Sequence, residues 1–336
     1  MTRFAAAALF LCAATGSAFG QPASEFYKGR TVELYIGYSV GGGYDIYARL
    51  LARHMGRHLP GSPVIVPRNM EGAGSLRLAN WLYKAAPRDG TVFGTIGRGI
   101  AFDPLLGTEG AQFKATEYGW LGSANDEVSV CAAWGKTGIA RFEDLSRKPV
   151  FVGGTGAGAD TDLFPKVMNS ILGTKLKLVT GYPGGNDITL AMQRGEVEAR
   201  CGWSWSSVKT NHPHWVKDGT IKLLVQLSLE KHADLPDVPL IMDFVRSPEQ
   251  RAILRLVFAR QVMGRPFLAP PGLPAERLAL LRRAFMETMK DAAFLAEAEK
   301  IKLEITPVDG AAVQRLVAEI YATPPENVRR AAEAVR

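Results

Sequence analysis

Two glycine-rich turns, each placed between an apolar extended run and a helical pattern, are the parts of the chain best suited to chemistry. The first turn, 41–43, follows the β-prone run 32–36 and precedes apolar residues at helical spacing from Ile46. The second turn, 153–158, repeats this construction after the run 149–152. A helix that begins at such a turn presents unpaired backbone N–H groups and the positive end of its dipole, which attract anions. We therefore expect the two turns to face each other across a cleft and to hold one small anionic ligand.

Charged and aromatic side chains elsewhere are candidates for further ligand contacts. Arg98 follows the strand-like run 91–96, and its planar guanidinium suits bidentate pairing with a carboxylate. Arg98 and Arg200 could each be a ligand clamp or an ion-pair partner, and we favour the clamp for Arg98 only. Trp203 and Trp205 either line the pocket from the end of a strand or pack between domains, and the sequence favours neither reading.

Other chemistries have weaker signals. His54 and His58 stand four apart on one helix and could share a metal, although surface positions near a helix end are favoured. The turn 153–158 superficially resembles a dinucleotide fingerprint, but it lies mid-chain and lacks a clear ribose-binding acid. The histidines, cysteines and acids show no spacing that indicates an activated nucleophile or an acid pair. We expect no catalytic residue, no metal and no cofactor.

The elements that position these turns alternate between strand and helix patterns, which predicts α/β folding with sites at strand C-termini. Amphipathic helical runs at 276–290 and 310–322 follow near the end. We expect one domain built from both chain ends, 21–122 and 228–336, with a second domain, 123–227, inserted between them. Two crossovers would then form a hinge around a ligand cleft.

The first twenty residues differ from the rest. Met1-Thr2-Arg3 is a short basic start, an apolar stretch follows, and small residues around Ala18 fit a signal-peptidase site. We expect residues 1–20 to be a cleaved signal peptide and the mature protein to be soluble and periplasmic. Loss of Arg3 lowers the formal charge from +7 to about +6. A modest positive charge attracts anions, and no basic run interleaved with aromatics indicates nucleic acid as a partner.

Two cysteines remain in the mature sequence, Cys131 and Cys201, each inside a strand-like run. An even pair in an oxidising compartment is a disulfide candidate. The alternative is two buried free thiols, and we favour the bridge.

Five segments in this order resemble the tripartite tricarboxylate transporter solute receptors, also called the Bug family. They are GYSVGGGYDIYARLLA (37–52), VIVPRNMEGAGSLRLANWLYKAAPRDGTVFGTI (64–96), GGTGAGADTDLF (153–164), GYPGGNDITLAMQRGEVEA (181–199) and LPDVPLI (235–241). The resemblance covers nearly the whole mature chain. It implies the type II periplasmic-binding-protein architecture, with two α/β domains joined by a two-crossover hinge around a ligand cleft.

The resemblance also implies a function. Receptors of this family capture a small carboxylate through backbone N–H groups and ordered water, and deliver it to a membrane permease with a large and a small subunit. Carried over by position, the ligand residues are Ser39, Val40, Gly42, Gly43, Tyr44 and Asp45 in the first loop, Thr155, Gly156, Ala157 and Asp160 in the second, and Tyr182, Gly185 and Asn186 in the third, to which we add Arg98 and Trp203.

The chain departs from the family pattern at three places. It has Ser39-Val40 where the family usually has a proline, Asp160 near a position that is often histidine, and Arg98 where arginine is rare. Asp160 would disfavour a nearby anion unless it points away or caps its helix, and Arg98 could compensate. The ligand is therefore expected to be atypical for the family.

Two alternatives to a transport receptor stay open. One is a secreted, hydrolase-like enzyme that uses the same cleft, and the other is a ligand sensor for a membrane signalling partner. We expect the receptor to be a monomer.

Overall fold

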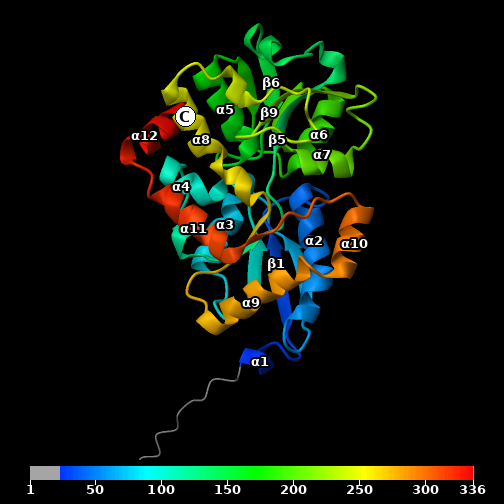
Figure 1. The fold of residues 1–336 in the computed structure, drawn as a ribbon, viewed down its shortest axis with the longest axis vertical. Helices are drawn as coiled ribbons and strands as arrows, with labels where there is room; N and C mark the ends of the chain where they lie inside the picture. Colours follow the sequence, from blue (N-terminus) through cyan, green and yellow to red (C-terminus); the bar gives the residue numbers. More distant parts are fainter. Residues whose placement is uncertain (1–22, 336) are drawn as a thin grey trace, which may run out of the picture.

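The computed structural model describes residues 23–335, and the expected signal peptide, residues 1–20, lies outside them. Two β-sheets, one above the other along the longest axis, form the frame of the molecule, and helices flank both (Figure 1). Strands and helices alternate along much of the chain, so the predicted α/β class is confirmed.

The first sheet has six strands in the order β11-β4-β10-β3-β1-β2. Strand β1 pairs in parallel with β2 and β3, whereas β10 runs antiparallel between β3 and β4. Side chains alternate along β1 as a pleated strand requires, since Val32, Leu34 and Ile36 are fully buried. The strands are β1 Thr31–Ile36, β2 Val64–Asn69, β3 Val92–Thr95, β4 Gly119–Ser123, β10 Pro266–Ala269 and β11 Val308–Asp309.

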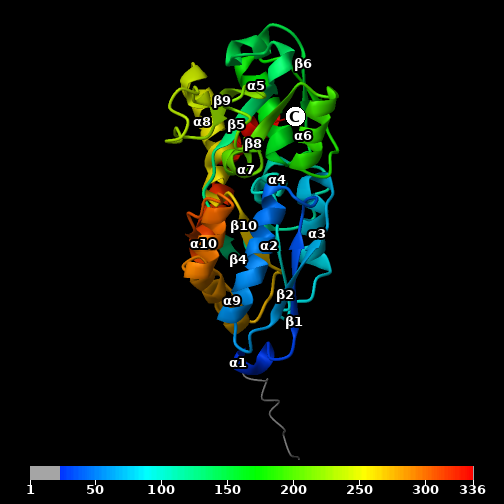
Figure 2. The ribbon, with the colours of Figure 1, turned by 90° about the vertical axis from the view of Figure 1, so that its right-hand side faces the viewer.

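Helices cover both faces of the first sheet, with α10 and α3 on opposite sides in Figure 2. One face packs on α2, α9 and α10 through a core that includes Leu50, Phe93 and Phe285. Asp309 starts α11 by accepting a hydrogen bond of 2.8 Å from the backbone N–H of Ala312. The helices are α1 Ala23–Phe26, α2 Gly43–Met55, α3 Leu76–Lys84, α4 Asp103–Leu106, α9 Ala275–Thr288, α10 Ala292–Lys300 and α11 Gly310–Tyr321.

The second sheet has five strands in the order β7-β6-β8-β5-β9. Strand β6 is parallel to β7 and β8, and β5 is antiparallel to β8 and β9. The strands are β5 Ser129–Trp134, β6 Val150–Gly153, β7 Leu176–Val179, β8 Ala199–Ser204 and β9 Ile221–Leu227. The helices of this half are α5 Asp160–Leu172, α6 Gly185–Arg194, α7 Trp205–Asn211 and α8 Pro248–Phe258.

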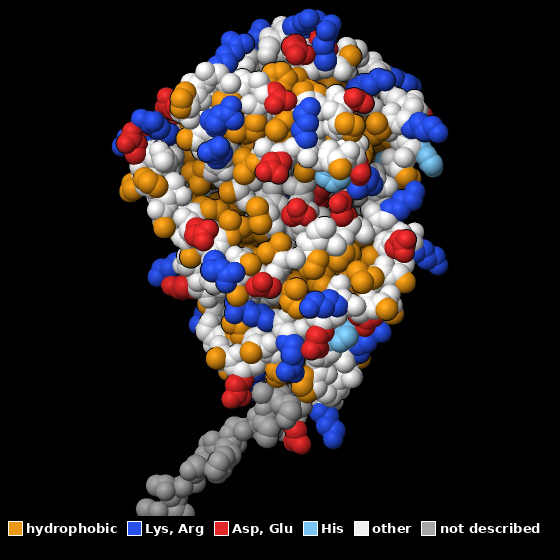
Figure 3. Space-filling model, in the orientation of Figure 1, with side chains coloured by type: hydrophobic (Ala, Val, Ile, Leu, Met, Phe, Trp, Pro, Cys, Tyr) orange, Lys and Arg blue, Asp and Glu red, His pale blue; other side chains and the backbone are white. Residues whose placement is uncertain are grey.

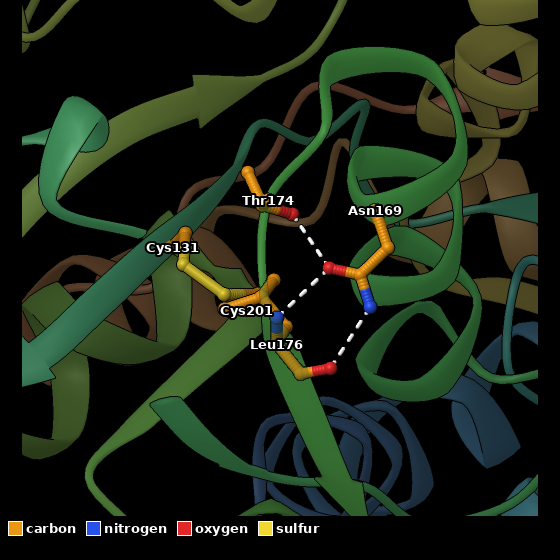
Figure 4. Close-up of a disulfide and its surroundings, with 5 residues drawn as sticks. All are labelled: Cys131, Asn169, Thr174, Leu176 and Cys201. Atoms are coloured by element: carbon orange, nitrogen blue, oxygen red, sulfur yellow. Dashed lines mark hydrogen bonds between the residues drawn. A yellow bond between two sulfur atoms is a disulfide. The ribbon is translucent and has the colours of Figure 1, made fainter. Parts of the chain in front are cut away.

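A disulfide joins Cys131 of β5 to Cys201 of β8, where the two strands are paired side by side, so the predicted bridge is confirmed. Figure 4 shows the bond beside Asn169 of α5. The Asn169 side chain accepts a hydrogen bond from the Leu176 N–H at 2.9 Å and donates one to the Leu176 carbonyl at 2.8 Å. These contacts fasten the end of α5 to the start of β7.

The connections between the two halves lie at residues 124–128 and after α8. Helix α8 packs on the second half, since Phe258 lies 5.0 Å from Phe164 of α5 between ring centroids. The chain then returns to β10 through a 3-10 helix, Ala259–Met263. Further 3-10 helices are Gly56–His58, Ala73–Ser75, Ile100–Phe102, Ala115–Glu117, Gly135–Thr137, Phe142–Ser146 and Ile241–Phe244. The domain limits expected from the sequence stay a prediction.

The last helix, α12 Pro325–Ala334, contacts α4 of the first half together with α5 and α8 of the second. Figure 1 places it on the side of the molecule away from α6 and α7. The largest apolar core is shared in the same way, because it includes Leu78 and Ile96 of the first half and Phe164 and Val225 of the second. The halves are therefore packed together over one side.

The outer surface mixes charges of both signs. On the face shown in Figure 3, Lys and Arg side chains are interspersed with Asp and Glu rather than gathered into one area. Among residues 23–335, no helix combines the length and the apolar character needed to cross a bilayer.

Candidate functional site: a pocket between the two halves

A small pocket lies where loops of both halves meet, with a volume of about 50 Å³. The first half contributes the start of α2 and the loop after β3, and the second contributes the starts of α5 and α6 and the end of β8. The lining residues are Tyr38, Gly42, Gly43, Tyr44, Gly97, Arg98, Gly99, Thr155, Ala159, Asp160, Thr161, Gly185, Asn186, Arg200, Gly202, Trp203, Ser204, Ser207, Asn211 and Arg265.

The mouth of the pocket is closed by hydrogen bonds between the halves. Ser39 Oγ donates to Asp187 Oδ2 at 2.7 Å, and the Ser39 N–H donates to the Pro183 carbonyl at 3.4 Å. Asn186 Nδ2 donates to the Val40 carbonyl at 3.3 Å. The structure is therefore in a closed conformation.

Glycines stand in both turns where the chain is closely packed. A Cβ on Gly156 would lie 2.3 Å from the backbone of Ala73 in the first half, so any larger residue there would hold the halves apart. A Cβ on Gly43 would lie 2.2 Å from Ser207 Oγ and 2.9 Å from Arg265 Nη2, and these two side chains would have to turn aside.

Arg98 is buried and its guanidinium is fully engaged by the protein. Nε donates to Asp160 Oδ2 at 2.6 Å, and the two terminal nitrogens donate to Ser129, Ser204 and the Gly264 carbonyl. Burial is the largest influence and would lower the pKa of Arg98, but the charge and hydrogen bond of Asp160, together with Tyr44 and Glu127, outweigh it and the pKa is raised. Asp160 is thus neutralised inside the pocket wall.

Arg265 forms the second buried ion pair. Its Nη2 lies 3.2 Å from Glu127 Oε2, and the same nitrogen donates to Ser206 and Ser207. Glu127 stands behind the wall and accepts from the backbone N–H groups of Val128 and Ser206. Buried charges of opposite sign are therefore matched here as well.

Arg200 differs from both. Its side chain is 9% exposed, and no carboxylate of the described residues lies within ion-pair distance of it. Nη1 donates to the Gly185 carbonyl at 3.0 Å and to Thr189 at 3.3 Å, whereas Nε is buried without a partner in the described chain. The guanidinium carbon lies 4.6 Å from the Trp203 ring centroid. Burial first, and then the charge of Arg265, lower the pKa of Arg200 to about 9.

Hydroxyl groups supply neutral donors to the same pocket. Ser207 Oγ accepts from Arg265 at 3.0 Å, and Tyr44 Oη accepts from the Arg98 backbone N–H at 3.0 Å. A hydroxyl that accepts one hydrogen bond keeps its own proton for another acceptor. Tyr38 and Tyr44 stack with ring centroids 4.7 Å apart and form an aromatic wall. The arrangement favours an acceptor-rich ligand.

The structure brings nine of the fifteen predicted ligand residues to the pocket wall. They are Gly42, Gly43, Tyr44, Arg98, Thr155, Asp160, Gly185, Asn186 and Trp203. Their ligand contacts stay a prediction, and of the two roles considered for Arg98, ligand clamp and ion-pair partner, the structure shows the ion pair, with Asp160.

The other six predicted residues lie beside the pocket rather than on its wall. Ser39 and Val40 are at the mouth, and Gly156 lies against Ala73, with Ala157 exposed next to it. Tyr182 Oη faces Glu196 at 3.5 Å. The remaining one, Asp45, is buried below the first turn, where it accepts from the Gly41 N–H and pairs with Arg49 at 2.9 Å.

Arg265 was not predicted as a site residue, and Arg200 was assigned no ligand contact. Arg200 is the charged residue of β8, and Arg265 comes directly before the apolar strand β10. A charged group in such a run must find a buried partner, which is the signal that could have identified both. Ser204, Ser207 and Asn211 are ordinary polar residues and give no comparable signal.

The structure also places the two histidines and Trp205, for which the sequence left alternatives. His54 of α2 is buried and lies 2.6 Å from Glu297 of α10, while His58, in the 3-10 helix after α2, lies 2.9 Å from Asp291 at the start of α10. The expected surface position is therefore wrong for His54. Trp205 does not line the pocket, and its Nε1 donates to Asp234 at 3.1 Å.

Two α/β halves that close on a buried pocket define the type II periplasmic-binding-protein architecture, so the predicted fold is confirmed. A solved structure of the periplasmic binding protein BugD is similar with a TM-score of 0.73 and 19% identity, over 92% of this chain and 98% of that one. A protein of R. palustris solved with adipate is similar with a TM-score of 0.71 and 18% identity, over 91% and 98%.

Among curated proteins, a UPF0065 protein of Bordetella bronchiseptica is 24% identical over 278 residues, which are 80% of this chain and 76% of that protein. No family model matches the chain. The resemblance to the Bug receptors seen in the sequence is confirmed by these similarities.

Proposed function

We propose that this protein is an extracytoplasmic receptor that binds a small carboxylate between its halves and delivers it to a tripartite tricarboxylate-type permease. The observation that supports this most is the pocket wall, which presents three guanidinium groups and only one carboxylate, that of Asp160. Such a wall suits an anion. The proteins of similar fold include one whose structure holds adipate, a carboxylate.

Binding would proceed by closure of the two halves. A ligand that enters the open cleft and contacts both walls stabilises the closed form, because only that form offers all its contacts at once. The hydrogen bonds of Ser39 and Asn186 across the mouth would then hold the ligand until the receptor meets the permease. Periplasmic localisation and a monomeric state are parts of this proposal.

The hydroxyl groups of the pocket favour binding over catalysis. A serine nucleophile needs an adjacent base that removes its proton. Ser204 and Ser207 instead accept hydrogen bonds from arginines, Ser204 from Arg98 and both from Arg265. A guanidinium at the oxygen stabilises the hydroxyl as an acceptor and does not take its proton.

Thermal unfolding of the mature protein against a panel of small carboxylates tests the proposal. A ligand of the folded state raises the melting temperature with its concentration. We expect a saturable rise with one class of acid, and mass spectrometry should recover that acid unchanged. Conversion of the acid would indicate the hydrolase-like alternative, and the absence of any shift after removal of copurified molecules would contradict the proposal.

Delivery to a permease requires a separate measurement. Cells that lack the receptor should lose uptake of the labelled acid and regain it when the wild-type gene is restored. If uptake is unchanged while a transcriptional response to the acid disappears, the protein is a sensor rather than a transport receptor.

A further inference from the structure

The buried charges around the pocket do not balance. Arg98 is matched by Asp160 at 2.6 Å, and Arg265 is matched by Glu127 at 3.2 Å. Arg200 is the guanidinium on this wall for which the described residues provide no carboxylate. One positive charge is therefore left without a counter-ion inside the closed protein.

A fourth buried arginine does not remove this excess. Arg260 lies behind the wall, with Nη1 3.5 Å from Asp160 Oδ1, and it is also attracted by Asp103. Neither acid forms an ion pair with Arg200, and the positive charges of Arg265 and Arg98 lower the pKa of Arg200. Burial of an uncompensated charge is costly, so an anion from outside would be strongly favoured beside it.

We infer that Arg200 is the residue that binds the carboxylate of the ligand and that the ligand is a short monocarboxylate. The inference rests on the proposed function and adds the binding residue and the class of acid. Ser207 and Tyr44 would donate to the oxygens of the same ligand, since their hydroxyls already accept from arginine N–H groups. The indole of Trp203 holds the Arg200 guanidinium in place from one side.

The size of the pocket limits the ligand. A volume of about 50 Å³ leaves room for more than one water molecule but is small for a ligand site, which favours a short acid. A second carboxylate would find no second unpaired guanidinium on this wall, because Arg98 and Arg265 are already paired. An amino acid is also disfavoured, because its ammonium would enter a wall with excess positive charge.

The first experiment compares acids on the wild-type protein. Isothermal titration with acetate, propionate, lactate and butyrate should show saturable binding for at least one of them. Succinate and adipate should bind that protein roughly 30-fold or more weakly, since their second carboxylate would be buried unpaired. Alanine, with the same carbon number as lactate, should also bind more weakly.

The second experiment replaces Arg200. Arg200→Met should raise the Kd of the best monocarboxylate by roughly 30-fold or more, and Arg200→Lys should raise it less, because lysine keeps the charge but loses the planar fork. The ligand-free melting temperature of Arg200→Met should not fall, since an unpaired charge is removed. Arg194→Met, on the exposed end of α6, is the matched control and should bind as wild type does.

The outcomes separate the two proposals. Binding of a monocarboxylate that Arg200→Met leaves unchanged would overturn the role of Arg200, and tighter binding of succinate or adipate would overturn the ligand class. The receptor function would survive either result. Failure of the wild-type protein to bind any acid would overturn both. If Arg200→Met does not fold, the acid series and Arg200→Lys decide.

Discussion

Ser39 of the first half and Asp187 of the second, 148 positions apart in the chain, are joined by a hydrogen bond of 2.7 Å across the mouth of the pocket. The contact exists only while the halves are closed. Ser39→Ala should therefore shift the equilibrium toward the open form by about 1 kcal/mol, which weakens ligand binding roughly fivefold. Titration calorimetry measures the affinity, and small-angle scattering measures the share of open molecules.

The control for this change is Ser170→Ala, at an exposed position of α5 far from the mouth in sequence. It should leave both affinity and scattering as in the wild type. An unchanged affinity for Ser39→Ala would mean that the contact at the mouth does not contribute to closure.

The ion pair of Arg98 and Asp160 gives a prediction about stability. Both side chains are buried, so Arg98→Met would remove the 2.6 Å pair and leave Asp160 only the longer contact with Arg260 at 3.5 Å. We expect the free energy of unfolding to fall by about 3–5 kcal/mol. Urea unfolding followed by circular dichroism measures it, and Lys114→Met, which breaks the exposed pair with Glu117, should not change the midpoint. A stable Arg98→Met variant would show that Asp160 is neutralised in another way.

The disulfide closes a loop with a sequence separation of 70 residues. Its removal should lower the free energy of unfolding by about 4 kcal/mol, because the unfolded chain regains the entropy of that loop. The double variant Cys131→Ala, Cys201→Ala is compared with the oxidised wild type in urea. Dithiothreitol should destabilise the wild type and leave the double variant unaffected, whereas an equal response of both proteins would contradict the prediction.

Asp103 predicts a dependence of stability on pH. Burial, opposed by the charge of Arg260, raises the pKa of Asp103 from 3.8 to about 7. Because the folded-state pKa lies above the unfolded one, the folded protein loses stability as pH rises from about 4 to about 7, and the loss is complete above that range.

Asp103→Asn removes this loss. The variant should be more stable than the wild type at pH 8 by up to about 4 kcal/mol and equal to it near pH 4. Thermal unfolding across this range measures the difference, with the exposed substitution Asp237→Asn as the control. A constant offset between Asp103→Asn and the wild type at all pH values would argue against the raised pKa.

Much of the fold could be predicted from the sequence because it depends on local patterns. The alternation in β1 and the apolar spacing of α2 are visible in a single window, and the turn at Gly43 marks their junction. The helix expected at 276–290 is α9, Ala275–Thr288, and that expected at 310–322 is α11, Gly310–Tyr321. Periodicity of burial is sufficient for such assignments.

The site was harder to predict, because it depends on which charged side chains the fold brings into contact. No residue next to Arg98 in the sequence indicates a partner for it. The fold brings Asp160, 62 positions away, into contact with it. Arg200 was expected to be an ion-pair partner, yet it is buried beside Trp203 and no carboxylate of the described residues pairs with it. Spacing along the chain does not show which distant side chains pair. The sequence alone therefore could not distinguish Arg98, which is paired with Asp160, from Arg200, for which the described residues provide no carboxylate.

The placement of α12 limits how the protein can move. Helix α12 contacts α4 of the first half and α5 and α8 of the second, so it joins the halves on one side. The mouth of the pocket is held by a separate contact, between Ser39 and Asp187. We therefore expect the halves to open by rotation about the side that carries α12, and not to move independently of each other. Deletion of α12 should allow the two halves to open further and over a wider range of angles between them.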